Sequence, residues 1–276
     1  METLWITLLG VVQGATEFLP VSSSCHLAVG QLLIAEVQPG TTLAAQPLTL
    51  EILLHLATFM AVIVYFRREV WAGLQGGCRG AVGLFKGDLG KLAKTDDGVN
   101  LALAVVVGTI PTAVIGLLLK DPASIVSESP VNLGLSFIGC ACLLLASRWW
   151  PGGHRRLSLR IALLIGLVQG IAVIPGISRS GATIAVGLAL GLEREDAARF
   201  SFLLSLPAIL GAAVLELDFE SLGADKNILA YLLGGLAAFV VGLAALHLLI
   251  RLVQSGRFWL FAPYVGAVGI MTMFVL

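Results

Sequence analysis

The stretch Glu17-Phe18-Leu19-Pro20-Val21-Ser22-Ser23-Ser24-Cys25-His26 interrupts an apolar region that runs from residue 3 to residue 35. A second apolar region, residues 161–191, is interrupted in the same manner by Pro175-Gly176-Ile177-Ser178-Arg179-Ser180-Gly181-Ala182-Thr183. Each interruption combines a proline, a group of hydroxyl side chains and one charged residue. The fold depends on what such a stretch can do inside an apolar region.

The composition places these regions in a membrane. Of the 276 residues 58% are hydrophobic and 12% are charged, whereas an ordinary soluble domain carries about 25% charged residues. A soluble fold this apolar would expose large apolar patches to water and would aggregate, whereas a helix bundle in a membrane exposes such patches to lipid. The 17 basic and 17 acidic residues balance, so no basic face for nucleic acid is expected. No CxxC pair occurs, which disfavours a zinc knuckle, and the N-terminus is read as mature sequence without a signal peptide.

Apolar stretches of about 20 residues, enough to cross a membrane, account for most of the chain. The predicted spans are residues 48–66, 99–119, 131–149, 200–217, 228–250 and 258–275. Polar, proline-containing backbone at membrane depth is tolerated only where it is buried in protein or lines a wet cavity. The two interrupted regions are therefore predicted to be re-entrant hairpins of half-helices, and a single kinked span is the alternative. The predicted fold is an all-α integral membrane protein with six transmembrane helices plus two re-entrant helical hairpins, in a single membrane domain.

The distribution of Lys and Arg orients these elements. The connection 67–98 holds six Lys or Arg, and residues 148–160 hold four Arg without an acid. Both connections are predicted to be cytoplasmic, which leaves the acid-rich connections 120–130 and 218–227 outside. The first hairpin then enters from the outer face and the second from the cytoplasmic face.

The two hairpins also resemble each other in sequence. Gly10-Val11-Val12-Gln13-Gly14 is similar to Gly166-Leu167-Val168-Gln169-Gly170, and a proline and a serine cluster follow each. Halves of opposite topology whose broken helices meet near the bilayer midplane form an inverted repeat, with the site at the repeat interface. The sequence predicts such a repeat, with halves of approximately 1–119 and 131–276.

Glu17 and Gln13 are the first candidate site residues. A charge in an apolar span costs roughly 2.5–3.5 kcal/mol on insertion scales, so Glu17 needs a partner. It is interpreted either as a structural carboxylate that caps backbone amides or as a metal ligand or general base. Gln13 shares a helix face with Glu17 and could ligate a hard cation, orient water or form a helix–helix hydrogen bond.

The hydroxyl and imidazole groups that follow have two interpretations. Ser22, Ser23 and Ser24 either satisfy backbone groups freed at the proline break or include a nucleophile that His26 activates. His26 itself is either a packing residue or that base. The pattern leaves both interpretations open.

Arg179 is the most informative residue of the second hairpin. An arginine cannot be neutralised, so at membrane depth it must pair with an anion. That anion is Glu17 in a structural interpretation and a phosphate in a functional one, because Arg binds phosphate bidentately and helix N-termini attract it. Gly176 and Gly181 suit a turn that brings backbone amides close to an anion. The roles of Glu51, His55 and His247 stay open.

Several of these motifs together resemble the undecaprenyl-diphosphate phosphatase family of bacterial membranes, also called the bacitracin-resistance family. The stretches that carry the resemblance are Gln13–Ser24, Leu54–Thr58, Gly108–Pro111, Pro175–Ile184 and Phe200–Leu204. They follow one another in the family's order over essentially the full length. The resemblance implies hydrolysis of undecaprenyl diphosphate to the monophosphate lipid carrier for cell-wall synthesis. It also implies a divalent cation, Mg or Ca, and a site open to the outer face of the bacterial plasma (inner) membrane.

The resemblance also implies roles for particular residues. Glu17 and Gln13 match the acidic motif and would be the metal ligands, Ser23 and His26 match a nucleophile and its base, and Arg179 matches the phosphate-binding arginine. The implied catalytic set is Glu17, Ser23, His26 and Arg179. The implied substrate-binding set is Gln13, Ser22, Ser24, Ser178, Ser180, Gly181 and Thr183.

Two positions depart from the family's usual pattern. Gln13 leaves a single carboxylate in the acidic motif, which argues against a two-carboxylate metal site. Cys25 stands where the family usually has Gly and could crowd the turn next to His26.

The predicted mechanism places the diphosphate in a midplane cavity with its prenyl chain leaving sideways into lipid. The attacking group is either Ser23, which would form a phosphoenzyme, or a water that Glu17 or His26 activates. The rival function is a transporter or flippase of polyprenyl phosphate, in which Arg179 binds without catalysing. The expected partners are the polyprenyl diphosphate substrate and membrane lipids, with no nucleic acid, and the sequence is compatible with a homodimer.

Overall fold

The structure, a computed structural model, describes residues 1–38, 47–150, 152–216 and 228–275. Within these ranges the chain is helical, and one isolated bridge between Arg155 and Leu192 is its only β pairing. The α-helices are α1 (Glu2–Phe18), α2 (Ser23–Val37), α3 (Pro47–Tyr65), α4 (Arg67–Lys86), α5 (Leu89–Thr95), α6 (Asp97–Leu118), α7 (Lys120–Glu128), α8 (Pro130–Ala146), α9 (Leu159–Ile171), α10 (Arg179–Ala189), α11 (Arg194–Glu216), α13 (Ile228–Gln254) and α14 (Ala262–Val275). Two short 3₁₀ turns, η2 (Ser147–Trp149) and η3 (Phe258–Phe261), extend α8 and precede α14. The predicted all-α class is confirmed.

Four of the described helical segments are long and apolar enough to cross a membrane. They are residues 97–118, 130–149, 194–215 and 228–254. A fifth is reached if α3 and α4, which are joined across a break at Phe66, are counted as one bent span. Shorter apolar helices lie at 23–37, 159–171 and 258–274. The chain is therefore a multi-pass membrane protein.

The chain divides into two compact units that interleave along the sequence. The first unit consists of residues 1–65 and 206–251, and the second of residues 66–205 and 252–276. The pair α1–α2 belongs to the first unit, and the pair α9–α10 belongs to the second. Each unit therefore contains one of the two interrupted apolar regions.

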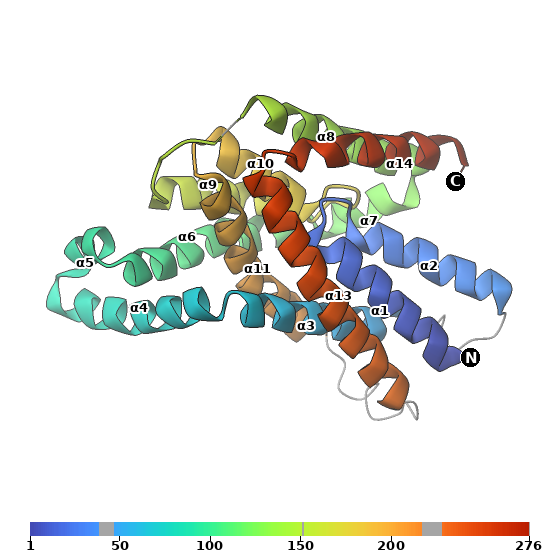
Figure 1. Ribbon diagram of the computed structural model, residues 1–276, viewed down its shortest axis with the longest axis horizontal. Coiled ribbons are helices and arrows are strands. Elements are labelled where there is room, and N and C mark those ends of the chain that lie inside the picture. The colour runs from blue at the N-terminus through green and yellow to red at the C-terminus, as the bar shows by residue number, and fades with distance from the viewer. Residues whose placement is uncertain (39–46, 151, 217–227, 276) are drawn as a thin grey trace. The chain divides into compact units, whose positions relative to one another are not determined.

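The first interruption is a tight break between two packed helices. α1 ends at Phe18 and α2 begins at Ser23, and the two helices lie side by side (Figure 1). Pro20 lacks an N–H and cannot continue a helix. Ser22 has φ 68° and is the only non-glycine residue with a positive φ among the described residues. This left-handed residue lets the chain turn back, so that Ser23 starts α2 beside the end of α1.

The second interruption has the same form. α9 ends at Ile171, α10 begins at Arg179, and the two helices pack against each other. Gly176 between them has φ 88°, a conformation that suits glycine. The predicted breaks are confirmed, and both are shifted relative to the polar stretches. Glu17 still belongs to α1, and residues 179–183 already belong to α10.

The similar glycine motifs serve the same packing purpose in each unit. In the first unit, a Cβ added to Gly10 would lie 2.1 Å from the carbonyl oxygen of Gly234 on α13. In the second unit, a Cβ added to Gly166 would lie 2.1 Å from the carbonyl oxygen of Gly108 on α6. Only glycine permits backbones to approach this closely, as small residues do between membrane helices. The motif thus packs α1 on α13 and α9 on α6.

Candidate active site

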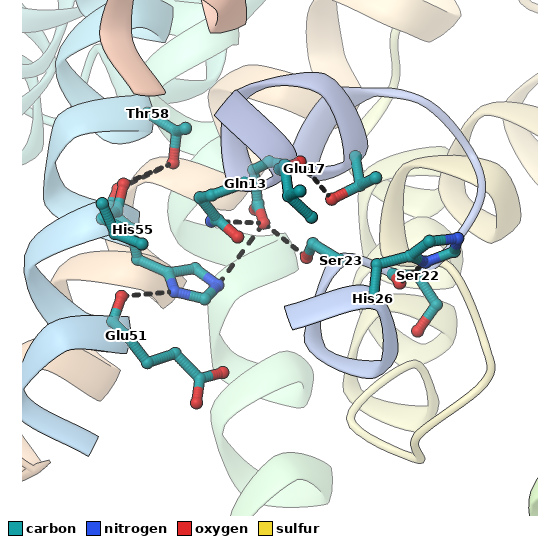
Figure 2. Close-up of polar contacts among 11 residues, drawn as sticks. Gln13, Glu17, Ser22, Ser23, His26, Glu51, His55 and Thr58 are labelled. Atoms are coloured by element: carbon teal, nitrogen blue, oxygen red, sulfur yellow. Dashed lines mark hydrogen bonds and ion pairs between the residues drawn. The ribbon is translucent and has the colours of Figure 1, made fainter. Parts of the chain in front are cut away.

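Glu17 is the centre of a polar cluster in the first unit (Figure 2). The residue is 6% exposed and lies in the last turn of α1. Its Oε2 accepts hydrogen bonds from Gln13 Nε2 at 3.1 Å and from Ser23 Oγ at 2.7 Å, and His55 Nε2 lies 3.4 Å away. Gln13 is one turn earlier on α1, Ser23 is the first residue of α2, and His55 lies on α3. Three helices therefore converge on one carboxylate oxygen.

His55 places an imidazole ring beside this buried carboxylate. Its Nδ1 lies 2.9 Å from the backbone oxygen of Glu51, so the Nδ1–H donates to that carbonyl. Its Nε2 faces Glu17. Because both ring nitrogens face oxygen acceptors, the geometry fits a doubly protonated imidazolium. Thr58, one turn further along α3, donates a 2.9 Å hydrogen bond to the backbone oxygen of His55.

The amide oxygen of Gln13 is an unused acceptor beside Glu17. Gln13 is fully buried, and its Oε1 has no hydrogen-bond partner within the part of the chain that the structure describes. A buried acceptor left unpaired costs about 1–3 kcal/mol, so this oxygen is suited to receive a donor or a cation. No group of three or more His, Cys, Asp and Glu among the described residues is placed to hold a metal ion. Gln13 and Glu17 thus bring an amide oxygen and a carboxylate into one buried cluster.

His26 lies on the far side of the serine run. Its Nδ1 is 2.8 Å from the backbone oxygen of Ser22, and Figure 2 shows its ring pointing away from Glu17 and Ser23. Ser22 is buried with its Oγ 3.5 Å from Cys25 Sγ, whereas Ser24 is exposed. Of the three serines, Ser23 is the one brought to the carboxylate. The assignment of His26 as its base stays a prediction.

The second unit gathers hydroxyl groups at the N-terminus of α10. Ser178 is the N-cap, and its Oγ accepts from the backbone N–H of Gly181 at 3.2 Å and lies 3.2 Å from Ser180 Oγ. Its own backbone N–H donates to Cys140 Sγ at 3.4 Å. Arg179, the first residue of α10, is half-buried beside this cap. A helix N-terminus carries partial positive charge, so these residues form an anion-attracting end.

Thr183 links this end of α10 to α11. It is fully buried, and its Oγ1 donates to the backbone oxygen of Arg179 at 2.7 Å and lies 2.5 Å from Ser201 Oγ. The bond fixes the first turn of α10, from which Arg179 projects. The sequence alone predicts no role for Ser201. Its only signal there is its place in the stretch 200–204 that contributes to the family resemblance.

Gln169, the counterpart of Gln13 in the repeated motif, is also fixed by its amide nitrogen. Its Nε2 donates to Thr112 Oγ1 at 3.3 Å and to the backbone oxygen of Leu204 at 3.2 Å. Its Oε1 is buried and has no partner among the described residues. Thr112 in turn donates to the backbone oxygens of Gly108 and Gly166. In both Gln13 and Gln169 the amide nitrogen is therefore hydrogen-bonded, and the amide oxygen has no partner among the described residues.

Each cluster has a definite chemical capacity. The first offers a buried carboxylate that accepts a hydrogen bond from a serine hydroxyl. The second offers an arginine, serine hydroxyls and the end of a helix dipole, which together suit a phosphate. Carboxylate, hydroxyl and phosphate-binding groups are the parts that phosphoryl transfer requires.

Comparison with known proteins gives matches over nearly the whole chain. The model of the family described as bacitracin resistance protein BacA matches residues 6–271. An undecaprenyl-diphosphatase of Desulfosudis oleivorans is 44% identical over 277 residues, which cover 100% of this chain and 99% of that protein. The undecaprenyl-diphosphatase of Desulforapulum autotrophicum is 44% identical over 99% of this chain and 98% of its own length. That of Korarchaeum cryptofilum is 40% identical over the full length of both.

Proposed function

The chain belongs to the bacitracin resistance protein BacA family, and from this membership and the Glu17 cluster we propose that it hydrolyses undecaprenyl diphosphate to undecaprenyl phosphate and inorganic phosphate. The observation that carries the proposal is the 2.7 Å hydrogen bond from Ser23 to Glu17. It places a hydroxyl within proton-transfer distance of a buried carboxylate. The activity returns the lipid carrier to cell-wall synthesis.

Glu17 acts as the general base in this proposal. In one route Ser23 attacks the terminal phosphorus, its proton passes to Glu17, and the bond to the undecaprenyl phosphate leaving group breaks. Water then cleaves the phosphoserine and releases inorganic phosphate. In the other route Glu17 takes the proton of a water that attacks directly, and the Ser23 hydroxyl orients that water. His55 holds the carboxylate in position in both routes.

Arg179 and the start of α10 bind the diphosphate. The guanidinium and the N-terminal amides of α10 neutralise negative charge on the phosphate oxygens. The Ser178 and Ser180 hydroxyls, which lie within 3.2 Å of each other, donate to the same group. Thr183 acts as a positioning residue, because its bonds hold the first turn of α10.

A divalent cation fits the residues beside this base. Glu17 offers a carboxylate and Gln13 an unpaired buried amide oxygen, the hard ligands that Mg²⁺ and Ca²⁺ prefer. Mg²⁺ is commonly held by one or two such protein groups together with substrate phosphates. The cation, when bound, would neutralise charge that develops on the transferred phosphoryl group.

The proposal includes the arrangement in the membrane. Six transmembrane helices and two re-entrant hairpins form an inverted repeat in the plasma (inner) membrane, with the site open to the outer face. The glycine packing supports this arrangement, because it is the same in both halves. The motif of the first hairpin packs on α13, which is the second span after the second hairpin. The motif of the second hairpin packs on α6, which is the second span after the first hairpin.

Phosphate release from undecaprenyl diphosphate in detergent micelles tests the proposal. Glu17→Gln and Arg179→Gln are expected to lose roughly 100-fold or more in kcat. The control variants Glu36→Gln and Arg160→Gln each remove a charge of the same sign from an exposed position, and their kcat is expected to stay near that of the wild type. Micelles have no second side, so a protein that only transports the lipid would release no phosphate. Near-normal turnover by purified Glu17→Gln would overturn the assignment.

A further inference from the structure

Helix α4 packs through glycines and turns its large apolar side chains outward. Its buried face consists of Gly76, Gly80 and Gly83. A Cβ added to Gly76 would lie 2.1 Å from the backbone of Gly98, so α4 lies directly against the start of α6 (Figure 1). The opposite face carries residues at helical spacing that are all exposed. They are Trp71, Leu74, Cys78, Val82 and Phe85, and we call them the α4 stripe.

The α4 stripe differs from an ordinary lipid-facing span because cations surround it. Residues 67–98 hold six Lys or Arg against four Asp or Glu, and Phe85, at the end of the stripe, is 91% exposed beside Lys86. A helix with one apolar face containing Trp and Phe and with basic residues around it is typical of the membrane–water interface. This pattern indicates that α4 lies along the membrane–water interface, on the side of the membrane where the connection 67–98 lies.

A cavity of about 530 Å³ lies between α4 and α5. Its charged lining consists of Arg79, Lys86 and Lys91 against one acid, Asp88. Arg79 is fixed by two hydrogen bonds to Asp96, from Nε to Oδ2 at 2.7 Å and from Nη2 to Oδ1 at 3.0 Å. Asp96 offsets the charge of Arg79 and Asp88 offsets that of one lysine, so one net positive charge remains at the cavity, and Lys86 and Lys91 supply it to an anion.

Two residues belong both to the cavity lining and to the α4 stripe. Cys78 and Val82 line the cavity and also lie on the exposed apolar face. A ligand with its anionic end in the cavity would therefore continue directly onto an apolar surface. A free phosphate would use only the first part of this arrangement, whereas a phospholipid would use both.

We propose that the α4–α5 cavity binds the headgroup of an anionic phospholipid. Lys86 and Lys91 hold the phosphate beside the fixed Arg79, and the acyl chains follow the α4 stripe. Basic segments at the cytoplasmic surface attract anionic lipids, and each Lys or Arg near the surface strengthens that attraction. The site lies outside the proposed catalytic residues, and so its test does not depend on their assignment.

Native mass spectrometry of the full-length protein in micelles doped with phosphatidylglycerol or phosphatidylcholine tests the site. The double variant Lys86→Gln/Lys91→Gln is expected to retain phosphatidylglycerol roughly 30-fold less than wild type. The matched control Arg68→Gln/Lys94→Gln removes two exposed cations of the same connection that do not line the cavity, and it should retain the lipid. Phosphatidylcholine should be retained poorly by all three proteins.

Two further measurements separate the lipid from its alternatives. Val82→Ser is expected to weaken phosphatidylglycerol retention, because it makes the shared wall polar, and millimolar inorganic phosphate should not displace the lipid. Equal retention by the cavity variant and wild type would overturn the proposal, as would an equal loss in the matched control. Displacement by inorganic phosphate would assign the cavity to a free anion instead.

Discussion

The Ser23 hydroxyl donates a 2.7 Å hydrogen bond to Oε2 of Glu17 across the break between α1 and α2. The acceptor is the last acidic group of one helix and the donor is the first residue of the next. The break is therefore what brings the carboxylate and the hydroxyl together. Ser22, whose φ of 68° is unfavourable for a residue with a side chain, provides the turn.

His55 should control how well Glu17 works as a base. His55→Ala removes the ring nitrogen that lies 3.4 Å from Glu17, which is expected to lower phosphate release about 10- to 100-fold, and His55→Gln should recover part of it by donating from its amide. The limb of the pH–rate profile that depends on His55 should disappear in both variants. His247→Ala, which removes a histidine bonded to Tyr65, is the control. A His55→Ala profile with the wild-type shape would leave His55 a purely structural role.

Gln13→Glu should make the fold depend on a divalent cation. The substitution replaces the Nε2 that donates to Glu17 at 3.1 Å by a second negative oxygen, and two carboxylates at this distance repel unless a cation lies between them. Thermal unfolding of Gln13→Glu is expected to begin at lower temperature with chelator and to recover with Mg²⁺ or Ca²⁺. The wild-type protein, measured in parallel, should respond less. An absence of any cation response in the variant would speak against a cation between these two side chains.

Gly10→Ala and Gly166→Ala should destabilise the protein to similar extents. Each added methyl would lie 2.1 Å from a carbonyl oxygen of the facing helix, and such overpacking costs roughly 1–3 kcal/mol. Gly139→Ala on α8, where a Cβ would meet no atom within 4 Å, is the matched control. Thermal unfolding in detergent measures all three. If Gly10→Ala unfolds at the same temperature as Gly139→Ala, the close packing of α1 on α13 is incorrect.

Asp96 should stabilise the start of α6 except in acid. Its Oδ1 accepts from the backbone N–H groups of Gly98 and Val99, and the hydrogen bond from Arg79 lowers its pKa below the usual range. The carboxylate form is favoured in the folded state, so its contribution is complete above the ordinary Asp pKa and is lost as the pH falls through the lowered value. Asp96→Ala is expected to cost about 1 kcal/mol at pH 7 through the lost cap.

Thermal unfolding at pH 7 and below pH 3 measures this contribution. Asp96→Ala should unfold at lower temperature than wild type at pH 7, and the difference should shrink in acid. The neighbouring exposed carboxylate, removed in Asp97→Ala, is the control. A difference of the same size at both pH values would show that the charge of Asp96 is not what matters.

The sequence predicts local features well, because they follow from spacing along one helix. Gln13 and Glu17, four residues apart, are predicted to share a face, and the hydrogen bond between them confirms it. The helix breaks follow from proline and glycine, which act on the backbone directly. The alternation of apolar stretches and charged connections is likewise sufficient to identify a membrane protein.

Contacts between helices are what the sequence leaves open. His55 meets Glu17 across α3 and α1, and Ser201 meets Thr183 across α11 and α10, so neither pair has a spacing that predicts it. Residues 67–98 read as a charged connection, because the apolar residues of α4 form a face only once the helix exists. The structure shows α4 and α5 there instead of an irregular loop.

The interleaving of the two units sets an order of assembly during synthesis. The glycine face of α1 packs on α13, which the ribosome makes only after nearly all of the chain has entered the membrane. Until then α1, which carries Glu17 and Gln13, lacks the backbone on which its glycine face packs. A chain that stops before α13 would leave the glycine face of α1 without its packing partner. The close packing of the first helix of the chain thus depends on one of the last to be synthesised.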